Sequence, residues 1–300
     1  MQNKLLANFA QNHHVEGLST ASLAALREGD MGYSINKAKL LLKFQHRINQ
    51  EVLQHHIIIA NPYTAWFEKG DLNMLQIKAF LIQFSVFSNQ FLVAQLNKMI
   101  HAETLESMRV SKEILANEIG VRFNSELSTN DGDYMGGTEG SVNGGVFNFS
   151  AAHFEWLYSI TKELNLSFAE IGQPKHGTEA TLFFCDELIR LYGGKDYQIS
   201  QAASYAIENW AAAGFWNQLI RGFRRFNNRN ALDLPLGFFI WHDQLEAQHA
   251  AHTQEELEEL YFALDIDEDA FIDHCNEMLN GVAVFWDGLD KQRRALASTH

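Results

Sequence analysis

Cysteine is scarce in this sequence, and its scarcity excludes two classes of site. Only Cys185 and Cys275 occur among 300 residues, so the chain has neither a disulfide framework nor a CxxC pair. Such usage is typical of proteins in a reducing compartment. Proline is equally rare, with 3 residues. Long stretches of apolar periodicity therefore run without a helix-breaking residue, which favours helices.

Basic residues are also few relative to acidic ones. The chain has 23 Lys and Arg against 37 Asp and Glu, and its formal net charge is −14 at pH 7. This charge is a poor match to a polyanion, so we expect no nucleic-acid partner. The N-terminal apolar run is too short for a signal peptide, and no apolar stretch approaches the roughly 20 residues of a membrane-spanning helix. The sequence thus predicts a soluble, cytoplasmic protein without a membrane partner.

Apolar residues, by contrast, are abundant at 46%, with 12% aromatics, which is the composition of a globular chain with a sizeable core. Helical periodicity recurs, and no strand pattern of useful length occurs, so the predicted fold class is all-α. We expect a loose N-terminal arm with a short helix over residues 1–33 and a helical domain over 34–292. Within it, single helices are predicted over about 34–60 and 198–228, with a bend at His252.

A glycine-rich insertion interrupts this helical domain at residues 124–150. Its six glycines lie among Ser, Thr, Asn and Asp, without the GxGxxG spacing or the Lys-Ser/Thr pair of phosphate-binding loops. A loop of this length inside a compact domain is usually functional or mobile. The sequence leaves two interpretations open: a disordered insertion and an active-site lid.

The segment that carries most chemistry runs from Trp241 to His249. On a helix of roughly 100° per residue, His242, Glu246 and His249 fall on one narrow stripe. Buried imidazoles and carboxylates without partners are costly, and a bound metal would remove that cost. The alternative is a surface helix with scattered polar residues, because Gln244 is polar too.

Further imidazoles and carboxylates occur in apolar settings on other expected helices. Glu118 lies near a helix end, His153 opens the next helix, and Glu208 lies in an alanine-rich stretch. Each alone is more simply an ordinary helix residue. Together with the stripe they make three carboxylates and three imidazoles, a set that suits two divalent ions in a helical bundle. Nitrogen and oxygen ligands without thiolate favour iron or manganese over structural zinc.

The order of these motifs resembles the haem-oxygenase-like di-iron oxidases and oxygenases. They belong to the larger superfamily that contains the TenA thiaminases and the pyrroloquinoline-quinone synthase PqqC. The similarity covers about residues 45–285. The residues that carry it are Asn61-Pro62-Tyr63 with Trp66 to Leu72, Leu115 to Gly120, Ala206 to Trp210 with Leu219 to Phe223, and Phe239 to His249. In two features this chain differs: Glu246 stands where the family usually has Asp, and the glycine-rich insertion separates Glu118 from His153.

The resemblance implies a haem-oxygenase-like bundle holding two iron ions, with manganese or an iron–manganese pair as alternatives. Its implied ligands are Glu118, His153, Glu208, His242, Glu246 and His249. Glu208 would be the bridging carboxylate and the residue nearest the chemistry. The implied activity is oxidation of a small organic substrate with O2, in the class of fatty acids, amino acids or amines.

Two other functions stay open. One is a metal-free, TenA-like hydrolase, for which Cys185 is the only plausible nucleophile, although a buried structural thiol is the simpler interpretation. The other is a metal-binding or interaction protein without turnover. The sequence also leaves open whether the chain forms a homodimer.

Overall fold

Helices dominate the described part of the chain. The computed structural model describes residues 2–123, 138–139, 145–147 and 152–297; for 2–3, 106, 122–123, 138–139, 145–147 and 245–252 it describes the backbone alone. The regular elements are α1 (Gln2–His13), α2 (Thr20–Glu28), α3 (Ile35–Glu51), α4 (His56–Ile59), α5 (Pro62–Phe67), α6 (Met74–Ile100), α7 (Leu105–Glu118), β1 (Val121–Phe123), β2 (Thr138–Glu139), β3 (Gly145–Phe147), α8 (His153–Glu163), η2 (Phe168–Glu170), η3 (Pro174–His176), α9 (Glu179–Glu187), the π-helical η4 (Leu188–Tyr192), α10 (Tyr197–Ala211), α11 (Phe215–Asn230), α12 (Gly237–Ala263) and α13 (Glu268–Ala297).

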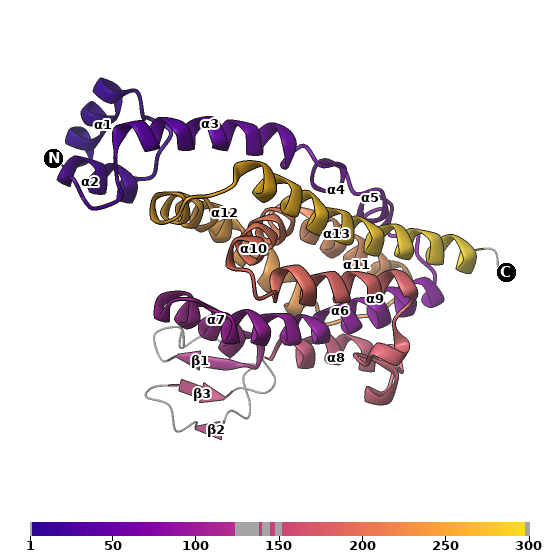
Figure 1. Cartoon of the computed structure of the whole chain (residues 1–300). Coiled ribbons are helices and arrows are strands. Elements are labelled where there is room, and N and C mark those ends of the chain that lie inside the picture. The colour runs from indigo at the N-terminus through magenta and orange to yellow at the C-terminus, as the bar shows by residue number, and fades with distance from the viewer. Residues whose placement is uncertain (1, 124–137, 140–144, 148–151, 298–300) are drawn as a thin grey trace.

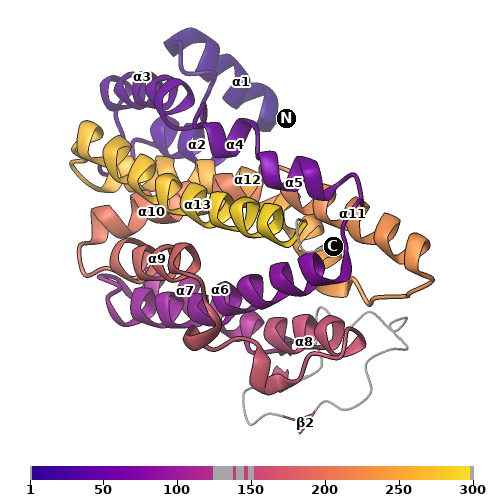
Figure 2. The same cartoon turned by 90° about the vertical axis from the view of Figure 1, so that its right-hand side faces the viewer.

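The long helix α6 is the centre of the bundle. It packs against α7, α8, α9 and α13, while α10 packs against α12 and α13 (Figures 1 and 2). The first helices form one end: α1 lies on α2, and both α2 and α3 contact α12. The two termini lie at opposite ends of the molecule in Figure 1. Residues from both halves of the chain therefore meet around α6 and α12.

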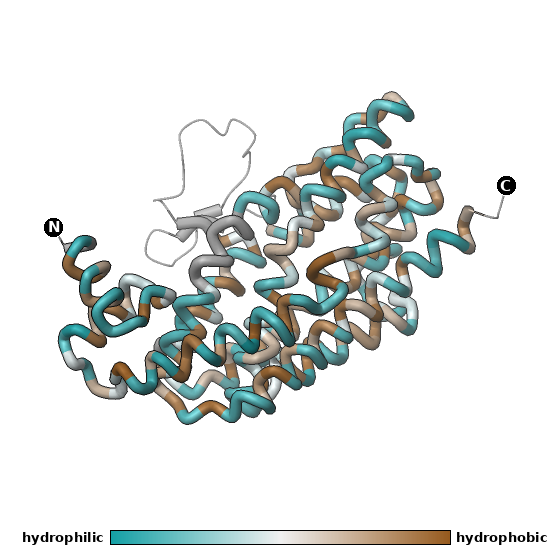
Figure 3. The backbone as a smooth tube through the Cα atoms, turned by 90° about the horizontal axis from the view of Figure 1, so that it is seen from above, coloured by the Kyte–Doolittle hydropathy of each residue, from teal (hydrophilic) through white to brown (hydrophobic). Residues whose placement is uncertain are grey.

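Aromatic side chains fill the space between these helices. Phe84 of α6 lies 5.9 Å, centroid to centroid, from both Trp216 of α11 and Phe239 of α12, and 6.3 Å from Phe285 of α13. Such pairs add a specific edge and face geometry to the burial of apolar area. Figure 3 shows polar and apolar residues mixed along the helices, as expected when each helix has one face inside. The core thereby holds α11 and α12 against α6.

Contrary to the expectation that no apolar stretch approaches this length, helix α6 is long and apolar enough to cross a membrane by length and composition alone. About half of its most apolar window is buried against neighbouring helices, which is the ordinary position of a core helix. The expectation of no membrane partner stays a prediction.

A small sheet follows α7. Its strand order is β1-β3-β2, and β3 pairs antiparallel with both neighbours, Val121 opposite Phe147 and Thr138 also opposite Phe147. The strands fall in and beside the glycine-rich insertion, and the sequence does not predict them because they are two or three residues long. The all-α class is confirmed, with this sheet as an addition. The rest of the insertion lies outside the described residues, so neither interpretation of it is tested.

Several predicted helix starts match the structure because the capping side chains make the expected hydrogen bonds. Ser19 and Ser34 accept from backbone N–H groups of Ser22 and Lys37, and Asn73 forms a full capping box with Gln76. These contacts set the starts of α2, α3 and α6.

Four local expectations are wrong. The N-terminal arm is not loose: it forms α1, which buries Leu6. The predicted helix over 34–60 ends at Glu51, and α4 begins only at His56. The helix predicted over 198–228 divides at Gly214, whose φ of 83° lies in the left-handed region. The helix does not end and restart at His252, where the bend was expected, because α12 continues through it. The boundary between residues 1–33 and 34–292 stays a prediction.

Candidate metal centre

Three helix segments that are distant in sequence meet beside α6 and present Glu118, His153 and His242. Glu118 is the last residue of α7, His153 is the first residue of α8, and His242 lies in the second turn of α12. Helix α8 packs against both α7 and α12. The start of α8 therefore lies beside the end of α7, where Glu118 is the last residue. One ligand atom from each of the three side chains lies within 4.8 Å of the other two.

The side chains of Glu118 and His153 lie close together, but no hydrogen bond joins them. His153 Nδ1 lies 2.9 Å from Glu118 Oε2, and the two side chains are only 9% and 13% exposed. Nevertheless, among the described residues this buried Nδ1 has no hydrogen-bond partner. The distance is that of an ion pair, whereas the direction is not that of a hydrogen bond. A buried ring nitrogen left in this way is costly unless something else binds it.

His242 is oriented by its own helix. Its Nδ1 lies 2.7 Å from the carbonyl oxygen of Phe238, one turn earlier. A carbonyl only accepts, so Nδ1 is the donor in this contact, and in the neutral ring Nε2 is the nitrogen that can bind a metal. Histidines that bind metals usually donate their other N–H in this manner, because the bond fixes the tautomer and makes the ligand more basic. The local contact thus prepares His242 as a nitrogen ligand.

The spacing of the three side chains fits a single ion. Ligands about 2.1 Å from a metal and at right angles to each other are roughly 3.0 Å apart, and opposite ligands are roughly 4.2 Å apart. The 2.9 Å contact matches the first value, and the 4.8 Å limit is slightly wider than the second. The unpartnered His153 Nδ1 and the oriented His242 therefore fit a metal with two nitrogen ligands and one oxygen ligand.

Aromatic rings cover this group. The His242 ring stacks on Trp216 at 4.7 Å with an interplanar angle of 25°, and it contacts Phe238 at 4.3 Å. The rings of His153 and His242 lie 4.7 Å apart at 68°. Apolar walls exclude water, which strengthens any electrostatic interaction at the site.

Of the six ligands that the resemblance implies, the structure brings these three together. Glu208 belongs to α10, is half-buried and is not part of the group. Glu208 and Glu118 nevertheless act electrostatically on the same buried side chain, that of Tyr192. Burial raises the pKa of Tyr192 well above its usual value, and both carboxylates raise it further. Glu246 and His249 belong to α12, but their side chains lie outside those the structure describes. The assignment of these three residues as ligands stays a prediction.

Two interior residues that the sequence reasoning missed are Lys98 and Tyr192. Lys98 Nζ lies 4.3 Å from the centroid of the Tyr192 ring and hydrogen-bonds to Ser204 Oγ at 2.5 Å. The available signal was that Lys98 is the only charged residue in the second half of α6, residues 87–100. The π-helical turn that places Tyr192 under Lys98 leaves no mark in the sequence.

The thiol that a hydrolase would need is not activated. Cys185 is buried, and burial, with a contribution from Asp186, raises the pKa of its thiol to about 12. Reactive cysteines instead lie in electropositive, partly exposed surroundings that lower the pKa. Cys275 is buried as well, and its thiol donates to the carbonyl oxygen of Ala202. Both cysteines have structural environments.

Comparison with known proteins identifies the fold. No protein-family model and no curated protein matches the chain. Among solved structures, a domain of unknown function with a haem-oxygenase-like fold from Shewanella denitrificans OS217 superimposes with a TM-score of 0.55 at 13% identity, over 87% of this chain and 95% of that one. A CADD-like protein of unknown function from Nostoc punctiforme PCC 73102 gives a TM-score of 0.57 at 15% identity, over 85% and 99%. The chain therefore has a haem-oxygenase-like fold, as its sequence motifs predict.

Proposed function

We propose that the protein is a non-haem oxidoreductase that uses iron or manganese to oxidise a small organic substrate with O2. The observation that carries the proposal is the convergence of Glu118, His153 and His242 from three helices, with a buried ring nitrogen that has no hydrogen-bond partner among the described residues. Two nitrogen donors and one carboxylate without thiolate suit these metals. When bound, the metal would supply the redox chemistry of O2 activation.

The protein's own residues would have distinct roles in this reaction. Glu118 would bring one negative charge, and His153 and His242 two neutral nitrogen donors. Trp216 and Phe238 would exclude water from the site through their contacts with His242. A second ion would need further ligands, and the resemblance alone supplies them: Glu208 as the bridging carboxylate, with Glu246 and His249 of α12.

Metal uptake and oxygen consumption test the proposal together. Protein prepared anaerobically should bind close to two equivalents of ferrous iron and then consume O2 with a transient visible absorption band. His242→Ala and Glu208→Ala should each lose the band. His46→Ala, at an exposed position on α3, is the matched control and should keep it.

The outcomes separate the alternatives. Iron uptake without O2 consumption in the presence of candidate substrates would favour a metal-binding protein without turnover. Thiamine-degrading activity that survives complete metal removal would favour the TenA-like hydrolase, which the raised pKa of Cys185 disfavours. An intact band in His242→Ala would refute the assigned site. We further propose a cytoplasmic location and neither nucleic-acid nor membrane partners, from composition alone.

A further inference from the structure

All six tryptophans of the chain lie on two runs of aromatic contacts that start at the candidate metal ligands. The short run leaves His153: the Trp156 ring lies 6.1 Å from it, centroid to centroid and nearly parallel at 7°, and Trp241 lies 5.9 Å beyond Trp156. The other four tryptophans belong to a longer run that leaves His242. The distribution of this residue type therefore follows the candidate centre.

The longer run crosses from α12 through α11 and α13 to α5. Its rings, in order from His242, are those of Trp216, Phe215, Trp286, Tyr63 and Trp66. The successive distances between ring centroids are 4.7, 4.5, 5.4, 5.6 and 5.4 Å. Trp210 is a side branch that stacks on Phe215 at 4.8 Å and 14°. These are the separations of aromatic rings in direct contact.

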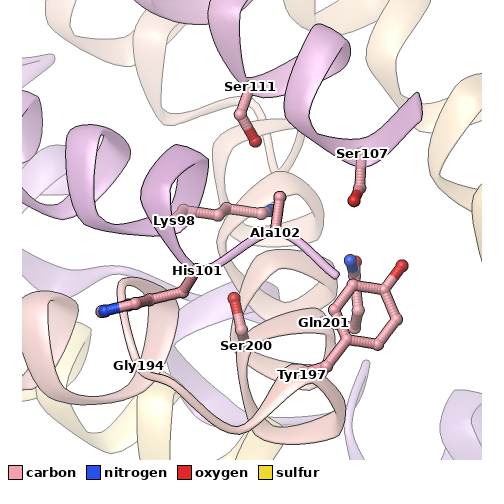
Figure 4. A pocket seen from close by; sticks show the side chains of 9 residues that line it. All are labelled: Lys98, His101, Ala102, Ser107, Ser111, Gly194, Tyr197, Ser200 and Gln201. Carbon is pink, nitrogen blue, oxygen red and sulfur yellow. The ribbon is translucent and has the colours of Figure 1, made fainter. Parts of the chain in front are cut away.

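The rings of this run pack against each other without a hollow between them. Figure 4 shows one hollow of the described residues, lined by Lys98 and other side chains of α6, α7 and α10. A second lies between α10 and α12. No ring of the longer run lines either of them.

The run leads from the interior to the surface. Trp216 and Trp286 are buried, whereas Trp66 is half-buried on α5. The guanidinium of Arg293 lies over the Trp66 ring at 4.2 Å, and its charge is offset by Asp290, which pairs with it at 2.6 Å. A positive charge costs more in an apolar core than at a ring that reaches water. An electron vacancy formed at Trp216 would therefore move outward to Trp66.

The residue types in the run matter for its chemistry. An indole can lose one electron and keep its N–H proton, whereas a benzene ring resists oxidation and a phenol releases its proton when oxidised. Phe215 and Tyr63 therefore fill the two gaps between successive tryptophans as bridges. Core packing alone would be served by phenylalanine, which the chain uses 22 times. Easily oxidised rings are instead concentrated on one path.

We propose that the longer run carries single electrons from the surface at Trp66 to the candidate metal centre when the oxidised centre has no substrate to attack. In each transfer the centre gains one electron and Trp216 loses one. The vacancy passes through Trp286 to Trp66, where a one-electron reductant of the ascorbate or thiol class fills it and is itself oxidised. Only electrons move, and each indole keeps its proton. The delivery to a metal rests on the proposed function, whereas conduction along the rings does not.

Conduction can be tested without iron. Ala213→Cys would carry a ruthenium–bipyridine photo-oxidant, because Ala213 is exposed in the turn between α10 and α11 while Cys185 and Cys275 are buried. The full chain would be loaded with zinc, which has no redox chemistry. After a flash in the presence of a soluble electron acceptor and O2, peptide mass spectrometry should find oxygenated tryptophan at Trp66.

Interrupting the run should remove this product. Trp286→Phe and, at a different ring, Phe215→Leu should each lose the oxygenated Trp66 in the labelled, zinc-loaded protein. Tyr33→Phe is the matched control, because Tyr33 is a half-buried ring whose stacking partner, Phe262, is not on the run, and it should keep the product. Oxygenated Trp66 that is undiminished in both interrupted variants, or absent from the uninterrupted protein, would overturn the proposal.

A second arm uses iron and the chain without the label. With O2 and no substrate, ascorbate should protect Trp216 from oxygenation in the wild type, and it should fail to do so in Trp286→Phe with full iron content. Equal protection in both proteins would overturn the proposed delivery of electrons to the centre. Conduction in the zinc-loaded protein together with no reaction of the iron-loaded protein with O2 would support the run as an electron path and count against the proposed function alone.

Discussion

Replacing Lys98 by Met should change the pH dependence of stability in a direction that the structure fixes. Burial lowers the pKa of this amine from 10.5 to about 8. Folding thus depresses the pKa of a base, so the unfolded chain binds the proton more tightly. The resulting penalty on the folded state is present in full below about pH 8 and disappears as the pH rises from 8 to 10.5.

The size of this effect follows from the two pKa values. Their difference corresponds to about 3 kcal/mol, and we discount it to about 2 kcal/mol between pH 7 and pH 10 because the side chain is partly exposed. Methionine removes the penalty but also the hydrogen bond to Ser204 and the contact with Tyr192, each worth about 1 kcal/mol. The variant should therefore be about as stable as the wild type at pH 7 and less stable at pH 10.

Urea unfolding at pH 7, 8, 9 and 10 measures the difference between the two proteins. From pH 7 to pH 10, the free energy of unfolding of the wild type should rise by about 2 kcal/mol relative to that of Lys98→Met. The Lys112→Met control, at an exposed position, should show no such trend. A difference between wild type and Lys98→Met that stays constant from pH 7 to 10 would refute the reasoning.

Two further predictions concern the scaffold. Gly222→Ala would place a Cβ 2.3 Å from the carbonyl oxygen of Phe67, so urea unfolding should show a loss of about 3 kcal/mol, whereas Gly237→Ala, with nothing within 4 Å, should change stability by less than about 0.5 kcal/mol. Glu258 is fully buried and accepts the backbone N–H of Ser19 at 3.0 and 3.1 Å. Glu258→Leu would orphan that group and cost about 2 to 4 kcal/mol; limited proteolysis should then cut first near α1 and α2, and an unchanged cleavage pattern would contradict this.

The fold could be predicted from local signals where those signals were strong. Capping residues such as Asn73 start helices through hydrogen bonds to their immediate neighbours, and a sequence displays them directly. The division at Gly214 was missed because one glycine within a helical pattern is often tolerated. Helix α1 was missed because its stability comes from burying Leu6 and Ala10 against the rest of the fold, which no local pattern reveals.

The three residues of the candidate site could be predicted from the sequence for a different reason. Glu118, His153 and His242 lie far apart in the chain, and composition alone does not pair them; the order of motifs shared with a known fold did. What it could not provide is their orientation: the bond from His242 to Phe238 and the unpartnered nitrogen of His153 depend on how α7, α8 and α12 meet. Lys98 was missed for the same reason, because its inward direction is set by α10 and the π-helical turn.

Anomalous X-ray diffraction from crystals loaded with ferrous iron or manganese tests the central claim most directly. The account predicts a peak about 2.0 to 2.3 Å from the ligand atoms of Glu118, His153 and His242, and the loss of that peak in His242→Ala. A map without density between these side chains, or with all of the metal bound elsewhere, would contradict it.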